Sequence, residues 1–328
     1  MTSWPLIIAH RGASGYLPEH TRGAYELAIA QGGDAVEPDV VMTADGVLAI
    51  RHENNLAETT DVGAKVAFAS RHQRRVVSGE VITGWFTEDF TWEELQTLKC
   101  LEPQPLMRAD SAKAPKQPIM RLSELLELVD AAGREIKVVV ELKSPTHFES
   151  LGFNMEEAFA RELDLAGWKR NDKRLIVESF ESSILRRCRE GGLGYQHIYL
   201  IDEVGTAVDQ RLLLGDKALT YSEQRRMESL RSLSKFLDGI SVSVSLFDSY
   251  EGANLVALCH DLGLKIFCWT LRAENKYLPH QWRKGFDLKA WGDWQPYFES
   301  IVATGVDGVF ADQPDLLVRL RDGVGDQP

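Results

Sequence analysis

The chain has 328 residues, 44% of them hydrophobic, and a formal net charge of −12 at pH 7. A chain of this length buries a large core, and α/β barrels of this size commonly form one domain, so we expect one domain over residues 1–328 with insertions. The acidic balance argues against a nucleic acid or an anionic membrane surface as partner, because both select basic patches. No window approaches the roughly 18 apolar residues of a membrane-spanning helix, so we expect no integral membrane segment.

Short apolar runs alternate with helical patterns, which is typical of repeated βα units and a largely parallel sheet. The predicted strands are Leu6–Ala9, Ala35–Val40, Val47–Arg51, Lys137–Leu142, Leu175–Ser179, His197–Ile201, Gly239–Val244, Lys265–Thr270 and Gly308–Ala311. The predicted helices are Thr21–Gln31, Ser123–Ala132, Met155–Ala166, Ser182–Glu190, Gly252–Leu262 and Trp294–Thr304. Residues 42–46 are too few for a helical crossover, so we expect Val47–Arg51 to be a local excursion. The other strands predict an α/β fold, the (β/α)8 TIM barrel.

Two long segments do not fit this alternation. Residues 54–117 combine polar turns with a tail rich in Pro, Lys and Ala, and residues 203–235 are charged and partly helical. Segments this long are usually functional or form subdomains of their own. We expect the first, inserted after the second βα region, to be a cap beside the site, and the second to be a surface insertion.

Charged residues stand two apart on several apolar runs. Because side chains alternate along a strand, Glu37 shares one face with Asp39, and Glu141 shares one face with Lys143. Three buried carboxylates that converge would repel one another without a cation, and oxygen-only ligands suit Mg²⁺ or Ca²⁺. The sequence therefore predicts one divalent cation, flanked by the histidines that end two neighbouring runs.

Several candidates also have a structural interpretation. Lys143 would neutralise Glu141 as an ion pair, because buried charges need partners. His20 would help to cap the helix that follows it. Trp269 fits either a substrate wall or a filler of the barrel, and we interpret Asp312 as a brace for the last turn. The four cysteines lack metal-binding spacing and are expected to be buried thiols.

The start of the chain bears on its location. His10 follows Met1 too closely for a secretory signal of roughly 15–30 residues, so we expect a cytoplasmic protein. A cleaved signal replaced by Met1 would look identical, and the protein would then be periplasmic.

Six segments occur in the order of a known family. They are HRGASGYLPEHT (His10–Thr21), EPDVVMTADGVLAIRH (Glu37–His52), ELK (Glu141–Lys143), SF (Ser179–Phe180), WTLRAENKYLP (Trp269–Pro279) and DGVFADQPDLL (Asp307–Leu317). The tripeptide HRG is weak alone, but its combination with PEHT, ExD and a following His is specific. The chain resembles the glycerophosphodiester phosphodiesterases, and within them the branch typified by the bacterial periplasmic enzyme. This resemblance also implies a (β/α)8 barrel.

The family pattern implies a role for each matching residue. It implies that Glu37, Asp39 and Glu141 bind the metal and that His10 and His52 are the acid/base pair. It also implies that Arg11 and Lys143 bind the phosphate, and it makes His20, Trp269 and Arg272 possible residues of the substrate pocket. Three positions depart from the common pattern: His20 and Arg272 stand where most members have Asn, and Glu53 stands where Asp is usual. His20 and Arg272 are shared with the periplasmic branch, and the role of Glu53 stays open.

The resemblance implies the metal-dependent hydrolysis of a small-molecule glycerophosphodiester to an alcohol and sn-glycerol 3-phosphate. Metal and cations would neutralise the phosphoryl oxygens, one His would remove a proton from the attacking oxygen, and the other would protonate the leaving alkoxide. A histidine with a pKa near 6.5 serves either role, so the assignment stays open. Attack by a glycerol hydroxyl through a cyclic phosphate and direct attack by water are both open, as are protein partners and oligomeric state.

Two other functions fit parts of the pattern. A phospholipase D-like barrel that acts on lysophospholipids and stops at a cyclic phosphate would need an apolar rim near the insertion. Phe86, Phe90 and Trp92 would supply that rim, although their spacing more simply indicates the inner face of a small helix. A non-catalytic barrel that binds phosphodiesters is disfavoured, because a binding protein needs no second histidine.

Overall fold

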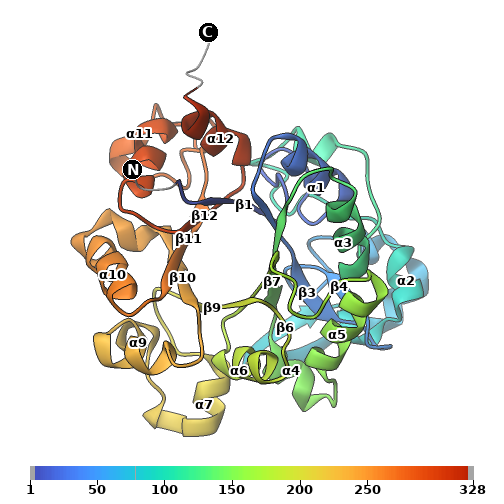
Figure 1. The fold of residues 1–328 in the computed structure, drawn as a ribbon. Coiled ribbons are helices and arrows are strands. Elements are labelled where there is room, and N and C mark those ends of the chain that lie inside the picture. Colours follow the sequence, from blue (N-terminus) through green and yellow to red (C-terminus); the bar gives the residue numbers. More distant parts are fainter. Residues whose placement is uncertain (1–3, 78, 324–328) are drawn as a thin grey trace.

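The computed structural model describes residues 4–77 and 79–323. Its main feature is a closed parallel barrel with helices around the outside (Figure 1). The barrel strands are β1 (Leu6–His10), β2 (Ala35–Glu37), β7 (Lys137–Leu142), β8 (Leu175–Ser179), β9 (Gln196–Ile201), β10 (Gly239–Ser243), β11 (Lys265–Leu271) and β12 (Gly308–Ala311). They follow the order β2-β1-β12-β11-β10-β9-β8-β7, and a pairing between β2 and β7 closes the ring. The predicted (β/α)8 barrel is confirmed.

The second predicted strand is divided at Pro38. Proline has no N–H to give to a ladder, and beyond it the chain continues as β3 (Asp39–Met42), which stays beside β7 with Asp39 opposite Glu141. After a short turn, β4 (Leu48–Ile50) pairs antiparallel with β3. The expected local excursion is therefore a hairpin arm, and it carries the chain to His52 at the mouth of the barrel.

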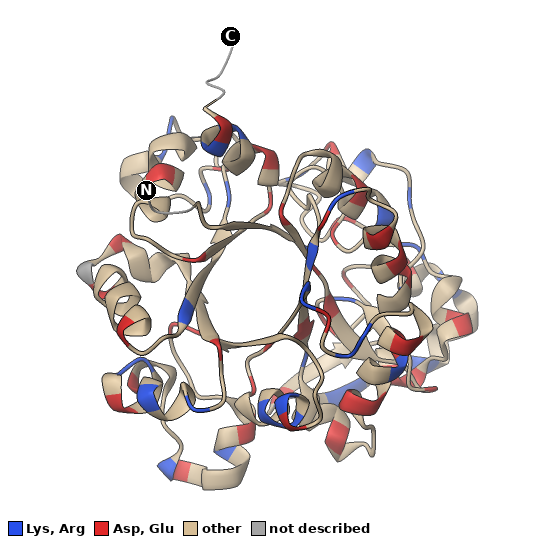
Figure 2. Ribbon diagram, in the orientation of Figure 1, with Lys and Arg blue, Asp and Glu red and all other residues tan. Residues whose placement is uncertain are grey.

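Helices cover the outside of the barrel, and the acidic and basic residues are spread over their outer surfaces and the connecting loops (Figure 2). The predicted helices appear as α1 (Arg22–Ala30), α3 (Leu122–Asp130), α5 (Met155–Leu165), α6 (Ser182–Glu190), α10 (Tyr250–Asp261) and α11 (Trp294–Val302). The side-chain oxygen of Thr21 caps α1 by accepting from Ala24 N at 3.2 Å. The helices α4 (Pro145–Ser150) and α12 (Pro314–Asp322) were not predicted, although each begins with a proline at a position where proline favours helix starts.

The interior of the barrel changes character along its axis. Its apolar filling comes from one face of the strands and includes Ile8, Ala35, Val139, Ile176, Ile198, Phe267 and Phe310. Because side chains alternate, the next residues on that face stand two positions further on. In β1, β2, β7 and β8 they are His10, Glu37, Glu141 and Glu178. The same alternation that fills the barrel with apolar groups therefore places charged groups at its carboxyl end.

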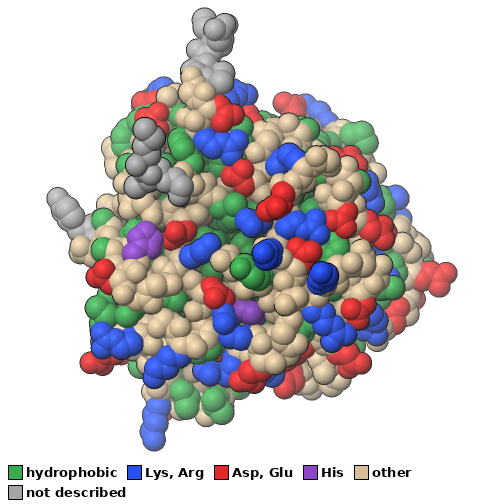
Figure 3. Space-filling view, viewed as in Figure 1, with side chains coloured by type: hydrophobic (Ala, Val, Ile, Leu, Met, Phe, Trp, Pro, Cys, Tyr) green, Lys and Arg blue, Asp and Glu red, His purple; other side chains and the backbone are tan. Residues whose placement is uncertain are grey.

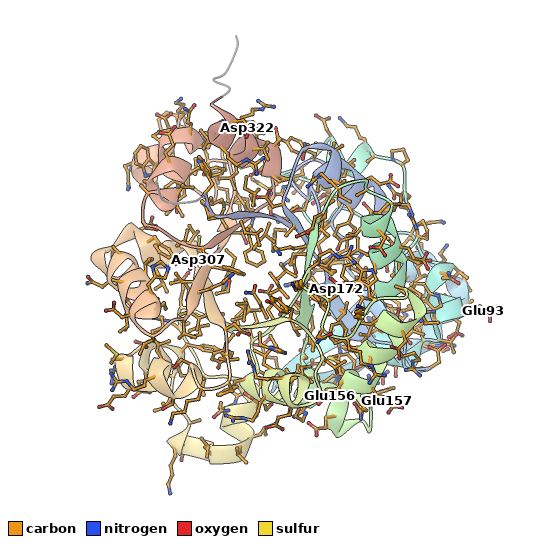
Figure 4. All side chains as sticks on the ribbon, in the orientation of Figure 1. Glu93, Glu156, Glu157, Asp172, Asp307 and Asp322 are labelled. Carbon is orange, nitrogen blue, oxygen red and sulfur yellow. The ribbon has the colours of Figure 1, made fainter. Side chains whose placement is uncertain are left out.

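Figure 4 labels Asp172 and Asp307, which precede β8 and β12 and mark the amino end of the barrel, opposite these charged groups. The four cysteines are free and buried, as predicted. No helix within residues 4–77 and 79–323 combines the length and the apolar character needed to cross a membrane.

The two long segments have different contents. Residues 54–117 hold a hairpin of β5 (Gln73–Val77) and β6 (Glu80–Gly84), the short helix α2 (Trp92–Gln96) and several 3-10 turns. Residues 203–235 hold α7 (Val208–Leu214), α8 (Tyr221–Gln224) and α9 (Met227–Leu233). Because α9 takes the place of the outer helix between β9 and β10, the second segment includes part of the regular barrel.

Candidate active site

A cavity of about 90 Å³ opens at the carboxyl end of the barrel. Most of the predicted site residues line it, namely His10, Arg11, Glu37, His52, Glu141, Lys143 and Trp269. Residues far apart in the sequence therefore meet because parallel strands present their carboxyl ends on one side, the side on which barrels of this kind carry their sites.

Three carboxylates form the acidic centre. Each of Glu37, Asp39 and Glu141 offers an oxygen within 4.8 Å of the others, and all three residues are buried. Burial and the charge of Asp39 raise the pKa of Glu37 well above its usual value, and burial raises the pKa of Glu141 to about 8 despite the charge of Lys143. A divalent cation with oxygen ligands would relieve this repulsion, so the donor set fits Mg²⁺ or Ca²⁺.

Arg11 and Lys143 bring positive charge to this centre. The Arg11 backbone has φ of +59°, in the left-handed region, and its N–H donates to Glu37 Oε2 at 2.8 Å. Its guanidinium lies 2.8 Å from Glu19 Oε2 and 3.2 Å from Asp39 Oδ2. Lys143 Nζ lies 2.9 Å from Glu141 Oε1 and 3.8 Å from Asp39 Oδ1. Although burial opposes ionisation, the charge of Lys143 helps to hold the pKa of Asp39 well below its usual range.

His20 is fully buried behind the acidic centre. Its Nε2 lies 2.9 Å from Asp39 Oδ2 and its Nδ1 lies 2.8 Å from the hydroxyl of Tyr25. Burial lowers the pKa of His20 to about 4, so the neutral ring donates one hydrogen bond and accepts another. The structure therefore places His20 as a partner of Asp39 and not on the cavity wall.

His10 is oriented by a buried carboxylate. Its Nδ1 lies 2.6 Å from Oδ1 of Asp312, the residue that follows β12. Oδ2 of Asp312 accepts from Arg272 Nε at 2.7 Å and from Arg108 at 2.5 Å. Arg108 also donates to Glu274 Oε1 at 2.9 Å, which ties the inserted segment to the loop after β11. Arg272 thus acts on His10 through Asp312 and does not line the cavity, and Asp312 does more than brace a turn.

His52 stands across the cavity with a more open carboxylate partner. Its Nδ1 lies 2.9 Å from Oε1 of Glu53, whose side chain is 57% exposed. Burial, together with the charges of Arg11 and Lys143, lowers the pKa of His52. Glu53, which stands where Asp is usual in the family, is thus close enough to hold Nδ1 of His52.

Glu178 and Phe180 also line the cavity, although neither was predicted as a site residue and Phe180 appeared only as part of the SF motif. Glu178 is buried on β8 beside Glu141, and its Oε2 has no hydrogen-bond partner within the described residues. Burial and the charge of Glu141 raise its pKa well above the usual value. The ring of Phe180 lies 5.9 Å from that of Trp269 and forms an apolar wall with it. The available signals were the carboxylate of Glu178 in the largely apolar run LIVES and the SF motif that contains Phe180.

The fold and this cavity define a barrel enzyme with an acidic centre between two histidines. The sequence matches the glycerophosphoryl diester phosphodiesterase family over residues 10–316. It is 30% identical over 332 residues to glycerophosphodiester phosphodiesterase GDPD6 of Arabidopsis thaliana, covering 95% of this chain and 84% of that one. The chain belongs to this family, as its motifs predicted, and is an enzyme that hydrolyses glycerophosphodiesters.

Solved structures share the fold. A crystal structure from Silicibacter pomeroyi DSS-3 has a TM-score of 0.69 and 24% identity, and covers 98% of this chain and 95% of that one. An Oleispira antarctica phosphodiesterase, solved in complex with the product sn-glycerol-3-phosphate, has a TM-score of 0.62 and 21% identity, with 97% of each chain covered.

The hydrogen bond between Asp312 and His10 leads to the first prediction. Burial and the charge of Arg11 lower the pKa of His10 to about 4, and the carboxylate of Asp312 opposes that shift. Asp312→Asn should therefore lower the pKa of His10 further and move the corresponding limb of the pH–rate profile to lower pH. We expect kcat to fall by about 10²-fold, at the low end of the general acid–base range.

Asp315→Asn is the matched control, because Asp315 lies on the same end of the barrel but binds Tyr16 at 2.7 Å. Thermal unfolding of both variants reports any loss of folding. An unshifted pH profile in folded Asp312→Asn would show that Asp312 has only a structural role.

Proposed function

We propose that the site hydrolyses glycerophosphodiesters to an alcohol and sn-glycerol 3-phosphate, with a divalent cation and with His10 and His52 as general acid and base. One observation carries the proposal: two histidines, each with Nδ1 held by a carboxylate, line one cavity together with Arg11 and Lys143. Glu37 and Glu141 line the same cavity and converge with Asp39 on one acidic centre. The product bound to the Oleispira antarctica phosphodiesterase supports the identity of the product.

The tautomers of the two histidines suit proton transfer. A carboxylate that accepts from Nδ1–H leaves Nε2 of a neutral ring as the acceptor. With Nδ1 bound to Asp312 and Glu53 respectively, His10 and His52 both have Nε2 for the reaction. One histidine removes a proton from the attacking oxygen, which belongs either to water or to a glycerol hydroxyl whose cyclic phosphate water then opens. The other histidine, protonated, donates to the leaving alkoxide.

The cationic residues and the acidic centre account for the charge of the phosphodiester. Arg11 offers a planar guanidinium suited to phosphoryl oxygens, and Lys143 adds a point charge beside it. Glu37, Asp39 and Glu141 would hold Mg²⁺ or Ca²⁺, which would supply further stabilisation of negative charge on the phosphoryl group. The remaining part of the substrate faces the apolar wall of the cavity.

A coupled assay for glycerol 3-phosphate tests the proposed function directly. Release would be measured over several glycerophosphodiesters, with and without chelator, and with Mg²⁺ or Ca²⁺ added back. We expect release that chelator abolishes and one of the two ions restores. Release that is independent of metal and substrate would overturn the proposal.

The metal assignment gives the second prediction. Glu141→Gln should reduce divalent-cation affinity by at least about 10-fold and reduce turnover with it, because one charged ligand is lost. Titration calorimetry with Mg²⁺ and Ca²⁺ measures the first effect and the coupled assay measures the second. If Glu141 only pairs with Lys143, the variant would lose stability while activity per folded molecule stayed unchanged.

The histidines give the third prediction. His10→Ala and His52→Ala should each lower kcat by about 10²–10⁴-fold with substrate binding largely retained. The double variant should be little worse than either single variant, because both groups serve one reaction unit. The wild type should show a bell-shaped pH profile, and each variant should lose one limb. An unchanged rate and profile would return that histidine to a structural role.

A further inference from the structure

The loop after β11 exposes three large apolar side chains within a few residues of one another. Residues 283–291, Arg-Lys-Gly-Phe-Asp-Leu-Lys-Ala-Trp, are all exposed, and we call them the rim segment. Phe286 has a relative exposure of 104%, Leu288 of 49% and Trp291 of 42%. Apolar side chains gathered on a surface mark an interaction site more often than chance exposure does.

The rim segment is held in place at its base. The side-chain amide of buried Asn275 donates to the backbone oxygens of Lys284 at 2.7 Å and Asp287 at 2.8 Å. Trp291 is bridged to Glu274 and its ring lies 6.4 Å from that of Tyr16. Phe286 is therefore presented outward by an anchored loop.

The rim segment lies on the same end of the barrel as the candidate active site. It belongs to the loop between the carboxyl end of β11 and α11. Earlier in that loop, the Tyr277 ring lies under the Arg272 guanidinium at 4.7 Å. The inserted segment adjoins it, because Gln104 accepts from the Tyr277 hydroxyl, and the nearby side chain of Leu106 is 79% exposed. Apolar exposure thus extends beside the mouth of the site.

The rim segment is basic in an acidic protein. Arg283, Lys284 and Lys289 outnumber the single acidic residue of the segment, Asp287, whereas the whole chain carries −12. Lys284 also pairs with Asp293 just beyond the segment at 2.9 Å, which leaves Arg283 and Lys289 as its main basic groups. By contrast, the amino end of the barrel, which faces the reader in Figure 3, mixes acidic and basic side chains. A short segment that combines exposed Phe, Leu and Trp with Lys and Arg has the composition of a membrane-interface anchor.

We propose that the rim segment docks the catalytic end of this protein on an anionic phospholipid surface. Phe286 and Leu288 enter the boundary between headgroups and acyl chains, Trp291 lies at headgroup level, and the basic side chains meet lipid phosphates. This proposal goes beyond the proposed function and does not depend on it, because binding to vesicles needs no turnover.

The negative charge of the whole chain does not prevent this docking. At physiological ionic strength the Debye length is about 8 Å, so charges on the far side of the barrel are screened from the lipid surface. The residues that touch the surface decide the local interaction. The net charge of −12, from which we expected no anionic surface as partner, is an average over the whole chain and does not register the local excess of basic residues in the rim segment.

Vesicle flotation of the full chain tests the proposal, with phosphatidylglycerol-containing vesicles compared with pure phosphatidylcholine. We expect binding to the anionic vesicles that weakens at high salt. Phe286→Ser should lower the partition coefficient by about 10-fold, because the variant no longer buries an aromatic ring in the lipid interface. Lys289→Glu should lower binding to the anionic vesicles only.

Matched controls come from the amino end of the barrel. Tyr195→Ser removes an aromatic ring that is 50% exposed there, and Lys173→Glu reverses an exposed charge before β8. Both should leave flotation unchanged, and thermal unfolding should show that all four variants are folded. Quenching of tryptophan fluorescence by brominated lipid should decrease in Trp291→Phe.

Two results would overturn the proposal. The first is a failure of the wild-type protein to float with anionic vesicles, or flotation of the Phe286→Ser variant that equals that of the wild type. The second is a dimer in light scattering that Phe286→Ser dissociates, which would make the rim segment an interface between two copies of the chain. Because thermal unfolding and flotation need no substrate, either result leaves the proposed function unaffected.

Discussion

The concentration of buried charge at one end of the barrel is the constraint on which the site depends. Glu37, Asp39 and Glu141 converge within 4.8 Å, and such a group is unstable without positive charge nearby. Arg11 adopts a left-handed backbone conformation while it contacts two of these carboxylates. Lys143 approaches from β7, and the cavity fits a divalent cation as the remaining source of charge. The groups that neutralise the acidic centre are also those suited to a phosphodiester.

The position of His10 shows how the inserted segment and the barrel depend on each other. Asp312, at the end of the last barrel strand, binds His10 and is itself held by Arg272 and by Arg108 from the inserted segment. A buried carboxylate with two arginines and a histidine has its charge satisfied and its oxygens occupied, so its orientation is fixed. The insertion therefore supports the orientation of His10, although none of its described residues, 54–77 and 79–117, lines the cavity.

The apolar surface beside the mouth is not where the sequence suggested one. Phe86 and Phe90 are fully buried, and Trp92 packs partly buried against the core, as expected for the inner face of a small folded unit. This removes the rim on which the lysophospholipid interpretation relied. The exposed apolar residues beside the mouth belong instead to the rim segment, where we propose that they dock the enzyme on a lipid surface. The cavity, and not the rim segment, selects the substrate.

The sequence by itself determined the barrel, its strand faces and the family, because alternation with period two and the order of the motifs are local properties. It predicted Glu37, Asp39 and Glu141 as one group, and the hairpin excursion before His52 followed from a connection too short for a crossover. Only the tertiary structure decided which distant groups touch. It placed Asp312 against His10, and His20 behind Asp39. The contact of Asp312 with His10 arises because β12 pairs with β1, so that the last strand lies beside the first. The contact of His20 with Asp39 arises because the loop after β1 folds back over β3. No local pattern records either approach.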